Sequence, residues 1–351
     1  MRQVSPSRAD LRSSITFADE PFTARFAPMR HGSIKPRFVA EFPNGRLWGR
    51  GYGYVVDAAD ALHADLSPSL DAFANKGDGR DRPHDGLRQI LLPRTRSYPG
   101  TLAAIGTPYC ENFHHWLLDA VPKFGVLGEV GVELDRLQGF LLPAGADCPW
   151  HREVLAMLNV GPSRIMRMNA RSQIRAERLL AVSYSEPGRE PERYSYTPEG
   201  LAFVRRLFAR SLAPNSDLPR RIIVSRARAA TRRWVQGNDG CDRLARAGFV
   251  QVRLEDRTLA GQAALFANAD CVVMPTGGGL ANLVFCRPGT RVVELFSPAY
   301  LPMFSAILAG PLHLDYRAIV GRHPSGVVGH SDGGGRDDID VPVERVLEQC
   351  A

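Results

Sequence analysis

Short apolar runs alternate with helix-compatible segments through the second half of the chain. Such alternation is typical of a parallel sheet with helices packed on its faces. It predicts a Rossmann-like domain, with a closing helix near the C-terminus. The expected strands lie at 222–224, 250–252, 271–273 and 292–295, with helices near 240–247 and 258–267, after the glycines at 277–279, and at 341–349.

The first half opens with a β-rich segment and then continues as a mixed α/β pattern. Residues 38–42 and 47–49 predict two short strands around an Asn44-Gly45 turn, because Asn-Gly is a preferred sequence of tight hairpins. A third strand is expected at 52–57. Further along, the pattern predicts a buried strand at 139–143 and helices at 151–158 and 198–212.

Length and composition indicate two folded domains. A chain of 351 residues exceeds the size at which one hydrophobic core usually stops growing. Its 44% hydrophobic and 23% charged residues are typical of a folded protein. Proline and charge at 186–196 predict the junction between domains. We therefore expect an N-terminal domain at 1–190, a Rossmann-like domain at 191–330 and a tail at 331–351, with loops at 1–30, 74–86 and 322–338.

Charge and targeting signals limit where the protein is expected to work and which molecules it is expected to bind. No stretch approaches about 18 apolar residues and the start lacks the apolar run of a secretion signal, so we expect a cytoplasmic protein. The net charge of +7 is compatible with anionic substrates or an anionic membrane surface, which keeps peripheral association with the inner face of the membrane open. No nucleic-acid-binding motif accompanies it, so no nucleic-acid partner is expected. The six cysteines form no CxxC pair and predict neither a zinc site nor a disulfide framework.

A glycine-rich turn is the first candidate for chemistry. Gly277, Gly278 and Gly279 follow an expected strand and precede a helix-compatible segment, so backbone N–H groups there can face an anion such as a nucleotide diphosphate. Glycine permits close approach and the positive φ that such turns often need. Glu294 ends the next strand, where a carboxylate can bind ribose hydroxyls. Turns of this kind also arise for packing alone, and the sequence leaves both interpretations open.

His115 and Asp119 form the second candidate. Residues four apart share one face of a helix, so the Asp119 carboxylate can orient the His115 imidazole and raise its basicity. Such a pair can take a proton from an attacking hydroxyl. It can also bind a metal, but no third ligand is visible nearby and no metal site is predicted. For His114, a structural role in the helix is favoured.

Arginines gather around the strand at 222–224. Six lie between positions 220 and 233, with no acidic residue among them. Ser225 and Arg226 follow the strand directly and, in a parallel sheet, face the same crevice as the glycine turn. A planar guanidinium suits a diphosphate because it donates two charge-assisted hydrogen bonds. We expect Arg226 to bind the ligand, and the surface residues to be Arg220, Arg221 and Arg232.

Three blocks follow one another along the chain: Asn112-x-x-His115-Trp116-Leu117-Leu118-Asp119, then Ile223-Val224-Ser225-Arg226, then Pro275-x-Gly277-x-Gly279-Leu280-x-Asn282 with Pro288-Gly289-Thr290 and Val293-Glu294. In this order they resemble glycosyltransferase family 61, a group often labelled capsular polysaccharide biosynthesis proteins. The resemblance spans roughly residues 36–300. It implies a GT-B fold, in which two Rossmann-like α/β domains face each other across a cleft, here with a small N-terminal β-rich segment.

The resemblance also implies an activity. Family members carry out inverting sugar transfer from a nucleotide diphosphate donor to a glycan or glycolipid hydroxyl, without an essential metal, so no cofactor is expected. Domain 1–190 would supply the acceptor side, with His115 and Asp119 as the catalytic base, and domain 191–330 the nucleotide-sugar site. Thr276 departs from the family, which commonly has histidine there, and this puts donor contact and donor choice in doubt. The implied donor-binding residues are Ser225, Arg226, Gly277, Gly278, Gly279, Asn282 and Glu294, with Asn112 and Thr276 as further candidates.

Two other functions compete with sugar transfer. A sugar-nucleotide epimerase shares a two-domain architecture but needs acid–base groups around a sugar that it does not transfer. A nucleotide-binding scaffold or regulatory module would keep the fold without catalysis, and the Thr276 departure favours this alternative. The reaction product distinguishes a transferase from an epimerase, since a transferase makes a glycosidic bond and an epimerase changes a stereocentre.

Overall fold

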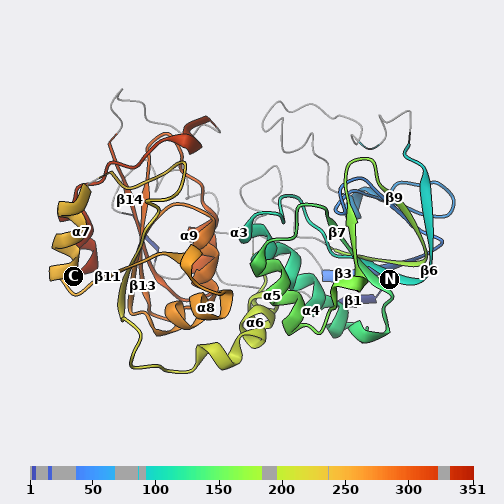
Figure 1. The fold of residues 1–351 in the computed structure, drawn as a ribbon, viewed down its shortest axis with the longest axis horizontal. Helices are drawn as coiled ribbons and strands as arrows, with labels where there is room; N and C mark the ends of the chain where they lie inside the picture. The colour runs from blue at the N-terminus through green and yellow to red at the C-terminus, as the bar shows by residue number, and fades with distance from the viewer. Residues whose placement is uncertain are drawn as a thin grey trace. The chain divides into compact units, whose positions relative to one another are not determined.

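The chain folds into two compact units, each built on its own β-sheet (Figure 1). The computed structural model describes residues 2–4, 15–17, 37–67, 86, 92–183, 196–235, 237–322 and 333–351. The first unit consists of Met1–Arg8 and Gly32–Leu207, and the second of Ala9–His31 and Phe208–Ala351. The sequence had placed this division near residue 190. The loops expected at 1–30, 74–86 and 322–338 and the junction expected at 186–196 lie largely outside the described residues.

The second unit contains an all-parallel sheet of six strands in the order β11-β10-β12-β13-β14-β2. All four strands predicted for this half are present. Two more extend the sheet beyond β13, and the sequence pattern did not reveal them. The strands are β2 (Ile15–Phe17), β10 (Arg221–Val224), β11 (Val250–Val252), β12 (Cys271–Pro275), β13 (Arg291–Phe296) and β14 (Asp315–Val320).

Helices cover both faces of this sheet, with α7 on one side and α8 and α9 on the other (Figure 1). Val273, Val293 and Ile319 share one buried cluster with residues of α7 and α10. Val272 and Val292, which alternate with them, are also fully buried. Burial on both faces explains why the sequences of β12 and β13 are mostly apolar. The helices are α7 (Gly237–Arg246), α8 (Leu259–Asn268), the 3-10 helix η10 (Gly278–Phe285), α9 (Phe304–Ala309) and α10 (Val343–Cys350).

The first unit contains a mixed sheet in the order β1-β3-β9-β6-β7-β8, with β4 and β5 attached beside β9. β9, β6, β7 and β8 run parallel, whereas β3 and β4 run antiparallel to β9. The sheet combines the predicted β-rich start with the predicted α/β layers. The strands are β1 (Arg2–Val4), β3 (Arg37–Pro43), β4 (Arg46–Trp48), β5 (Tyr54–Val56), β6 (Thr95–Ala104), β7 (Gly139–Pro143), β8 (Ile165–Met168) and β9 (Gln173–Val182).

Asn44 and Gly45 do not form the predicted hairpin turn. β3 and β4 pair with the same strand, β9, in one continuous register. The Asn44 N–H donates to the Glu177 carbonyl at 2.8 Å, and the Ala176 N–H donates to the Gly45 carbonyl at 3.0 Å, so both residues continue the ladder. Asn44 has φ 52°, a left-handed conformation that asparagine tolerates. The prediction of a hairpin was wrong because β3 and β4 both pair with the long strand β9, which keeps them in line.

In the first unit, one continuous helical run contains His115 and Asp119. It consists of α3 (Phe113–His115), the π-helical turn η4 (Trp116–Ala120) and α4 (Val121–Glu129). α4 packs on β3 and β9 and against α6 (Pro198–Leu207). The predicted helix at 198–212 is therefore α-helical to Leu207, where a 3-10 turn follows. The remaining elements are α5 (Pro149–Met157) and the 3-10 turns η2 (Ala64–Leu66), η5 (Leu134–Arg136), η6 (Pro162–Arg164), η8 (Ala209–Leu212), η9 (Leu254–Asp256) and η11 (Gly333–Arg336).

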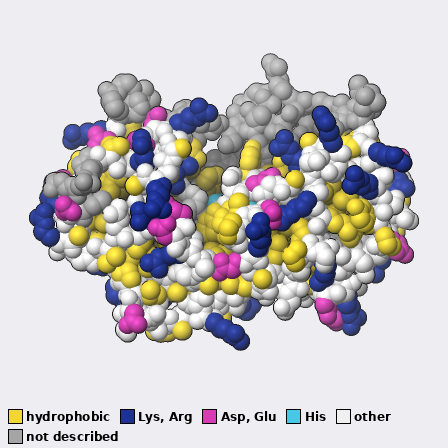
Figure 2. Space-filling view, in the orientation of Figure 1, with side chains coloured by type: hydrophobic (Ala, Val, Ile, Leu, Met, Phe, Trp, Pro, Cys, Tyr) yellow, Lys and Arg dark blue, Asp and Glu magenta, His cyan; other side chains and the backbone are white. Residues whose placement is uncertain are grey.

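Positive charge is dispersed on the face of the molecule that Figure 2 shows. On the face drawn in Figure 2, Lys and Arg side chains are spread out and interspersed with Asp and Glu. Many of the arginines pair with a carboxylate nearby, as Arg178 does with Glu41 at 2.8 Å. Within the described ranges, no helix combines the length and the apolar character that crossing a bilayer requires.

Gly51 and Gly128 give opposite expectations for alanine substitution. Gly51 has φ 77°, and a Cβ there would lie 2.4 Å from the Leu142 carbonyl carbon, so Gly51→Ala should cost more than about 1 kcal/mol. Gly128 lies in α4 with nothing within 4 Å of an added Cβ, so Gly128→Ala should stabilise by about 0.5–1 kcal/mol. Urea unfolding measures both within the same unit. Shifts of the same sign would contradict this account of the packing.

Candidate functional site

The carboxyl ends of β10 and β12 meet where the strand order of the second unit reverses. β11, the next strand in the chain, lies on one side of β10, and β12 lies on the other. Ligands of open α/β sheets bind outside the carboxyl ends of the strands at such a switch point. The register pairs Ile223 with Val273, so the residues that follow the two strands emerge side by side. These residues are Ser225 and Arg226 after β10 and Thr276 and Gly277 after β12.

The Arg226 guanidinium lies directly against Gly277. A Cβ added to Gly277 would stand 2.5 Å from Arg226 Nη1, so a side chain at this position would displace the guanidinium. Arg226 Nε and Nη2 donate to the carbonyls of Arg232 and Thr231, at 3.3 and 3.1 Å. Burial lowers the pKa of Arg226, and the charge of Arg232 lowers it further. The structure thus brings together two residues that the sequence had assigned to one crevice.

Close approach, not positive φ, explains Gly277 and Gly279. Gly277 has φ 164°, which is extended backbone. An added Cβ on Gly279 would stand 2.9 Å from Leu254 Cδ1, so that glycine serves packing. The following segment is a 3-10 helix whose first hydrogen bond runs from Leu280 N–H to the Gly277 carbonyl, at 3.1 Å. The amides of Gly277, Gly278 and Gly279 precede that bond, as the anion-site hypothesis requires.

Asn282 and Ser225 hold this region in place from the interior. Asn282 is fully buried, and its Nδ2 donates to Gln262 Oε1 at 2.8 Å and to the Gly279 carbonyl at 3.0 Å. It therefore ties η10 to α8 directly below the glycine turn. Ser225 is also buried, and its Oγ accepts from the Ala227 N–H at 3.3 Å. Both positions favour a supporting role over direct contact with a donor.

Glu294 lies in the interior of the second unit and has no solvent exposure. Its Oε2 accepts a hydrogen bond of 2.6 Å from the Tyr316 hydroxyl. Burial raises the pKa of Glu294 to about 7, against the opposing effects of Tyr316, Thr276 and Ser305 and of the Arg232 charge. Thr276 is itself 2% exposed. The predicted contact between Glu294 and a ribose therefore needs access that the described residues do not provide, and a supporting role is favoured.

The buried carboxyl of Glu294 makes stability depend on pH. Its pKa rises from an ordinary 4.5 to about 7 on folding, so its stabilising effect is full below the lower value and is lost as the pH rises through the higher one. Glu294→Gln should remove this loss. The difference in Tm, variant minus wild type, should therefore increase between about pH 5 and about pH 8.

Glu344→Gln is the matched control for that measurement. Glu344 is exposed and pairs with Arg243, and its pKa is lowered by hydrogen bonding, so it stays ionised throughout this pH range. Its Tm difference should be constant. A constant difference for Glu294→Gln as well would show that the buried carboxyl does not bind a proton on folding.

His115 and Asp119 lie one helical turn apart in the first unit, as predicted. His115 Nδ1 is 2.7 Å from Asp119 Oδ2, and their side chains are 20% and 7% exposed. When Nδ1–H donates to the carboxylate, the lone pair lies on Nε2, the atom that can accept a proton. Burial raises the pKa of Asp119, and His115 opposes that shift. Asn112, at the start of the run, is exposed, and its carbonyl accepts from the Trp116 N–H at 3.0 Å.

The turn between His115 and α4 is π-helical, which the sequence did not predict. Pro122 lies two residues beyond its end. A proline within a helix lacks an N–H and crowds the carbonyl four residues earlier, here that of Leu118. A wider turn just before the proline accommodates this conflict. Single π turns inside α-helices occur frequently at functional sites.

Two buried histidines support the His115 turn. His114 Nε2 lies 2.7 Å from the Tyr196 hydroxyl, and burial lowers the pKa of His114 to about 3, which agrees with the structural role expected for it. His151 accepts from the Cys148 N–H through Nδ1 and donates to the Cys110 carbonyl at 2.9 Å. Burial lowers the pKa of His151 to about 4. His151 thus fixes the loop that leads to the candidate base, a contact that no local pattern reveals.

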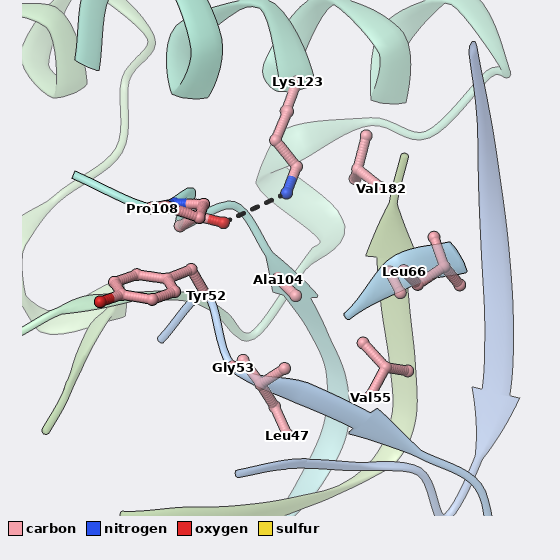
Figure 3. Close-up of a pocket in the computed structure, with 11 residues that line it drawn as sticks. Leu47, Tyr52, Gly53, Val55, Leu66, Ala104, Pro108, Lys123 and Val182 are labelled. Atoms are coloured by element: carbon pink, nitrogen blue, oxygen red, sulfur yellow. Dashed lines mark hydrogen bonds between the residues drawn. The ribbon is translucent and has the colours of Figure 1, made fainter. Parts of the chain in front are cut away.

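Lys123 reaches from α4 into a small cavity beneath the same loop (Figure 3). Its Nζ donates to the Gly106 carbonyl at 3.3 Å, and burial lowers the pKa of Lys123 to about 7. The cavity is small, with a volume of about 20 Å³, and most of its lining is apolar. This hydrogen bond from the Lys123 side chain anchors the loop to the helix. The residues drawn around it include Leu47, Tyr52, Gly53, Val55, Leu66, Ala104, Pro108 and Val182.

A comparison with known protein families gives a match that includes residues of both candidate regions, the His115–Asp119 pair and the glycine turn. Residues 113–293 match Glycosyltransferase 61, which is just over half of the 351 residues. The chain belongs to glycosyltransferase family 61. The matched range includes the His115–Asp119 pair, Arg226 and the glycine turn, whereas Asn112 and Glu294 lie one residue outside it. A search of curated proteins gives no match.

Family 61 membership identifies the protein as a glycosyltransferase with a sugar donor and an acceptor. It confirms the resemblance inferred from the three blocks. The candidate residues fall into two groups, a histidine–carboxylate pair in the first unit and an arginine–glycine site in the second. Across the described ranges, no three His, Cys, Asp or Glu side chains gather in a group that would hold a metal ion.

Proposed function

We propose that this family 61 glycosyltransferase is an inverting enzyme that moves a sugar from a nucleotide diphosphate to a hydroxyl of a glycan or glycolipid, in surface polysaccharide synthesis. The observation that carries the proposal is the Arg226 guanidinium packed against Gly277 at the switch point of a parallel sheet. A cation and free amides at this position suit a diphosphate. The family match supports the transfer of a sugar.

The proposed reaction exchanges one bond at the anomeric carbon for another. The acceptor oxygen forms a bond to that carbon, and the bond to the β-phosphate oxygen breaks with its electron pair. The acceptor proton passes to His115 Nε2, which Asp119 orients through Nδ1. Charge grows on the departing diphosphate, where Arg226 and the turn amides stabilise it without reorganisation.

Three further features belong to the proposal. The two units form a GT-B enzyme, with the acceptor side in the first and the donor site in the second. Transfer is independent of a metal, because the guanidinium and amides supply positive charge at the leaving group. The enzyme works in the cytoplasm, and its excess of arginine suits peripheral contact with an anionic membrane that carries glycolipid acceptors.

A donor panel with a product assay tests the function. Thermal shifts against sugar nucleotides identify the donor, since a ligand that binds the folded state raises its stability. Incubation with that donor and glycan or glycolipid acceptors should then form a glycosidic bond. A product with only a changed stereocentre would identify an epimerase, and donor binding without turnover would identify a nucleotide-binding module.

His115→Ala should lower kcat by about 10²–10⁴-fold, because it removes the general base. Asp119→Asn should also lower kcat, since an amide no longer fixes the Nδ1–H tautomer. His63→Ala is a matched control, because His63 Nε2 also lies 3.0 Å from a carboxylate, that of Asp57, in the same unit. Equal activity of His115→Ala and His63→Ala would remove His115 from the mechanism.

Gly277→Ala should weaken donor binding more than it destabilises the protein. The new Cβ meets only the end of a flexible side chain, so the fold can adjust by moving the Arg226 guanidinium. Losing its charged hydrogen bonds should raise the donor Kd by about tenfold or more. Isothermal titration and thermal unfolding measure the two effects, with Gly128→Ala as the control. Unchanged donor affinity would show that Arg226 does not depend on Gly277 for its position.

A further inference from the structure

Most arginines around β10 are accounted for by contacts within the second unit. Three pair with aspartates from elsewhere in the chain, although the local sequence has no acid. Arg221 donates to the Cys350 carbonyl at 3.2 Å, and its guanidinium lies over the Phe249 ring. The three ion pairs are Arg220 with Asp270 at 2.8 Å, Arg228 with Asp256 at 2.9 Å, and Arg233 with Asp338 at 2.6 Å.

Among the described residues no carboxylate forms an ion pair with Arg226 or Arg232, although the Glu255 charge acts on Arg226 and raises its pKa. Both are partly buried. The Arg232 Nε is buried and makes no hydrogen bond to the described part of the chain. The prediction that Arg232 is a solvated surface residue was therefore wrong, as it was for the half-buried Arg221.

Arg232 lies beside the candidate donor site. Its carbonyl accepts from Arg226 Nε, and its charge lowers the pKa of both Arg226 and Glu294. Its guanidinium carbon lies 5.4 Å from the centroid of the Tyr300 ring. The backbone of Arg232 therefore contacts the same arginine that packs against Gly277, and the charge of Arg232 acts on that arginine.

The backbone around Arg232 is held by its neighbours. Arg233 donates to Asp338 through both its N–H and its guanidinium, and its carbonyl accepts from the Ile339 N–H at 2.8 Å. Arg232 itself has φ 58°, a left-handed conformation. These contacts hold Arg232 in an unfavourable backbone conformation.

We propose that Arg232 is a second guanidinium of the donor site, so that Arg226 and Arg232 together bind the diphosphate of the sugar nucleotide. The inference rests on the proposed function for the identity of the ligand. Two like charges held together and partly out of water repel each other, and an anion between them relieves that repulsion. Two planar forks also match the several oxygens of a diphosphate better than one.

Binding of inorganic pyrophosphate to the full-length protein tests the inference without any sugar transfer. Binding should be measured by isothermal titration with pyrophosphate and then with UDP, GDP, CDP and dTDP. The Kd values should be about tenfold or more higher for Arg232→Ala than for wild type. Arg228→Ala is the control, because Arg228 is in the same segment but is exposed and paired with Asp256. Its Kd should change by less than about twofold. Equal affinities of the two variants would overturn the proposal.

Thermal unfolding separates ligand binding from a structural role. Removing one of two unpaired charges relieves repulsion, so Arg232→Ala should leave the Tm of the free protein unchanged or higher, while the Tm increase with pyrophosphate falls. Arg232→Lys keeps the charge without the fork and should recover part of the affinity. A lower Tm of free Arg232→Ala, with a normal increase on pyrophosphate addition, would assign Arg232 to the fold and overturn the proposal.

The results also distinguish this inference from the proposed function. Sugar transfer with a pyrophosphate affinity independent of Arg232 would reject the inference alone. Pyrophosphate binding that depends on Arg232, in a protein that transfers no sugar from any donor, would reject the proposed function alone. A wild-type protein that binds neither pyrophosphate nor any nucleoside diphosphate would reject both.

Discussion

The parallel pairing of β10 with β12 is the constraint on which the candidate donor site depends. Residues 226 and 277 are far apart in the sequence, and only the sheet register brings them together beyond the strand ends. Once there, the guanidinium and the turn compete for the same space, and the absence of a Cβ at Gly277 resolves that competition. The site is thus a property of the sheet, with the loops filling positions that the strands define.

The arginines around β10 differ in whether a carboxylate pairs with them. Several exposed ones pair with aspartates, as Arg220 and Arg233 do, and such exposed pairs contribute little to stability. Arg226 and Arg232 are both partly buried, and the charge of Arg232 acts on Glu294, whose pKa burial raises to about 7. A carboxyl that binds a proton offsets less of their charge. The cluster therefore keeps an excess of positive charge, which suits a bound anion better than an empty site.

The sequence predicted those features that depend on neighbours along the chain. The His115–Asp119 contact follows from helical spacing alone, and β10, β12 and β13 are recognisable because burial on both faces makes them apolar. β14 escaped notice because Asp315 and Arg317 interrupt its pattern, and these two side chains pair with each other.

Features that depend on distant partners could not be predicted in this way. The Asn44-Gly45 pair looks like a hairpin turn until β9 supplies a partner for both flanking segments. The burial of Arg232 depends on a segment anchored by Asp338, more than one hundred positions later. The roles of Lys123 and His151 could not be predicted, because each depends on a hydrogen bond to a loop that is distant in the sequence.

The departure at Thr276 is best understood through the buried carboxyl next to it. Thr276 is 2% exposed, and its hydroxyl acts on Glu294 in the interior of the unit. Its effect is therefore exerted on the support of the turn, whereas Arg226 and Gly277 form the surface that an anion would meet. A change at this position alters how the carboxyl is held and leaves the cationic surface intact. For this reason the departure is weak support for a protein that has lost catalysis, and the retained His115–Asp119 pair argues for an active transferase.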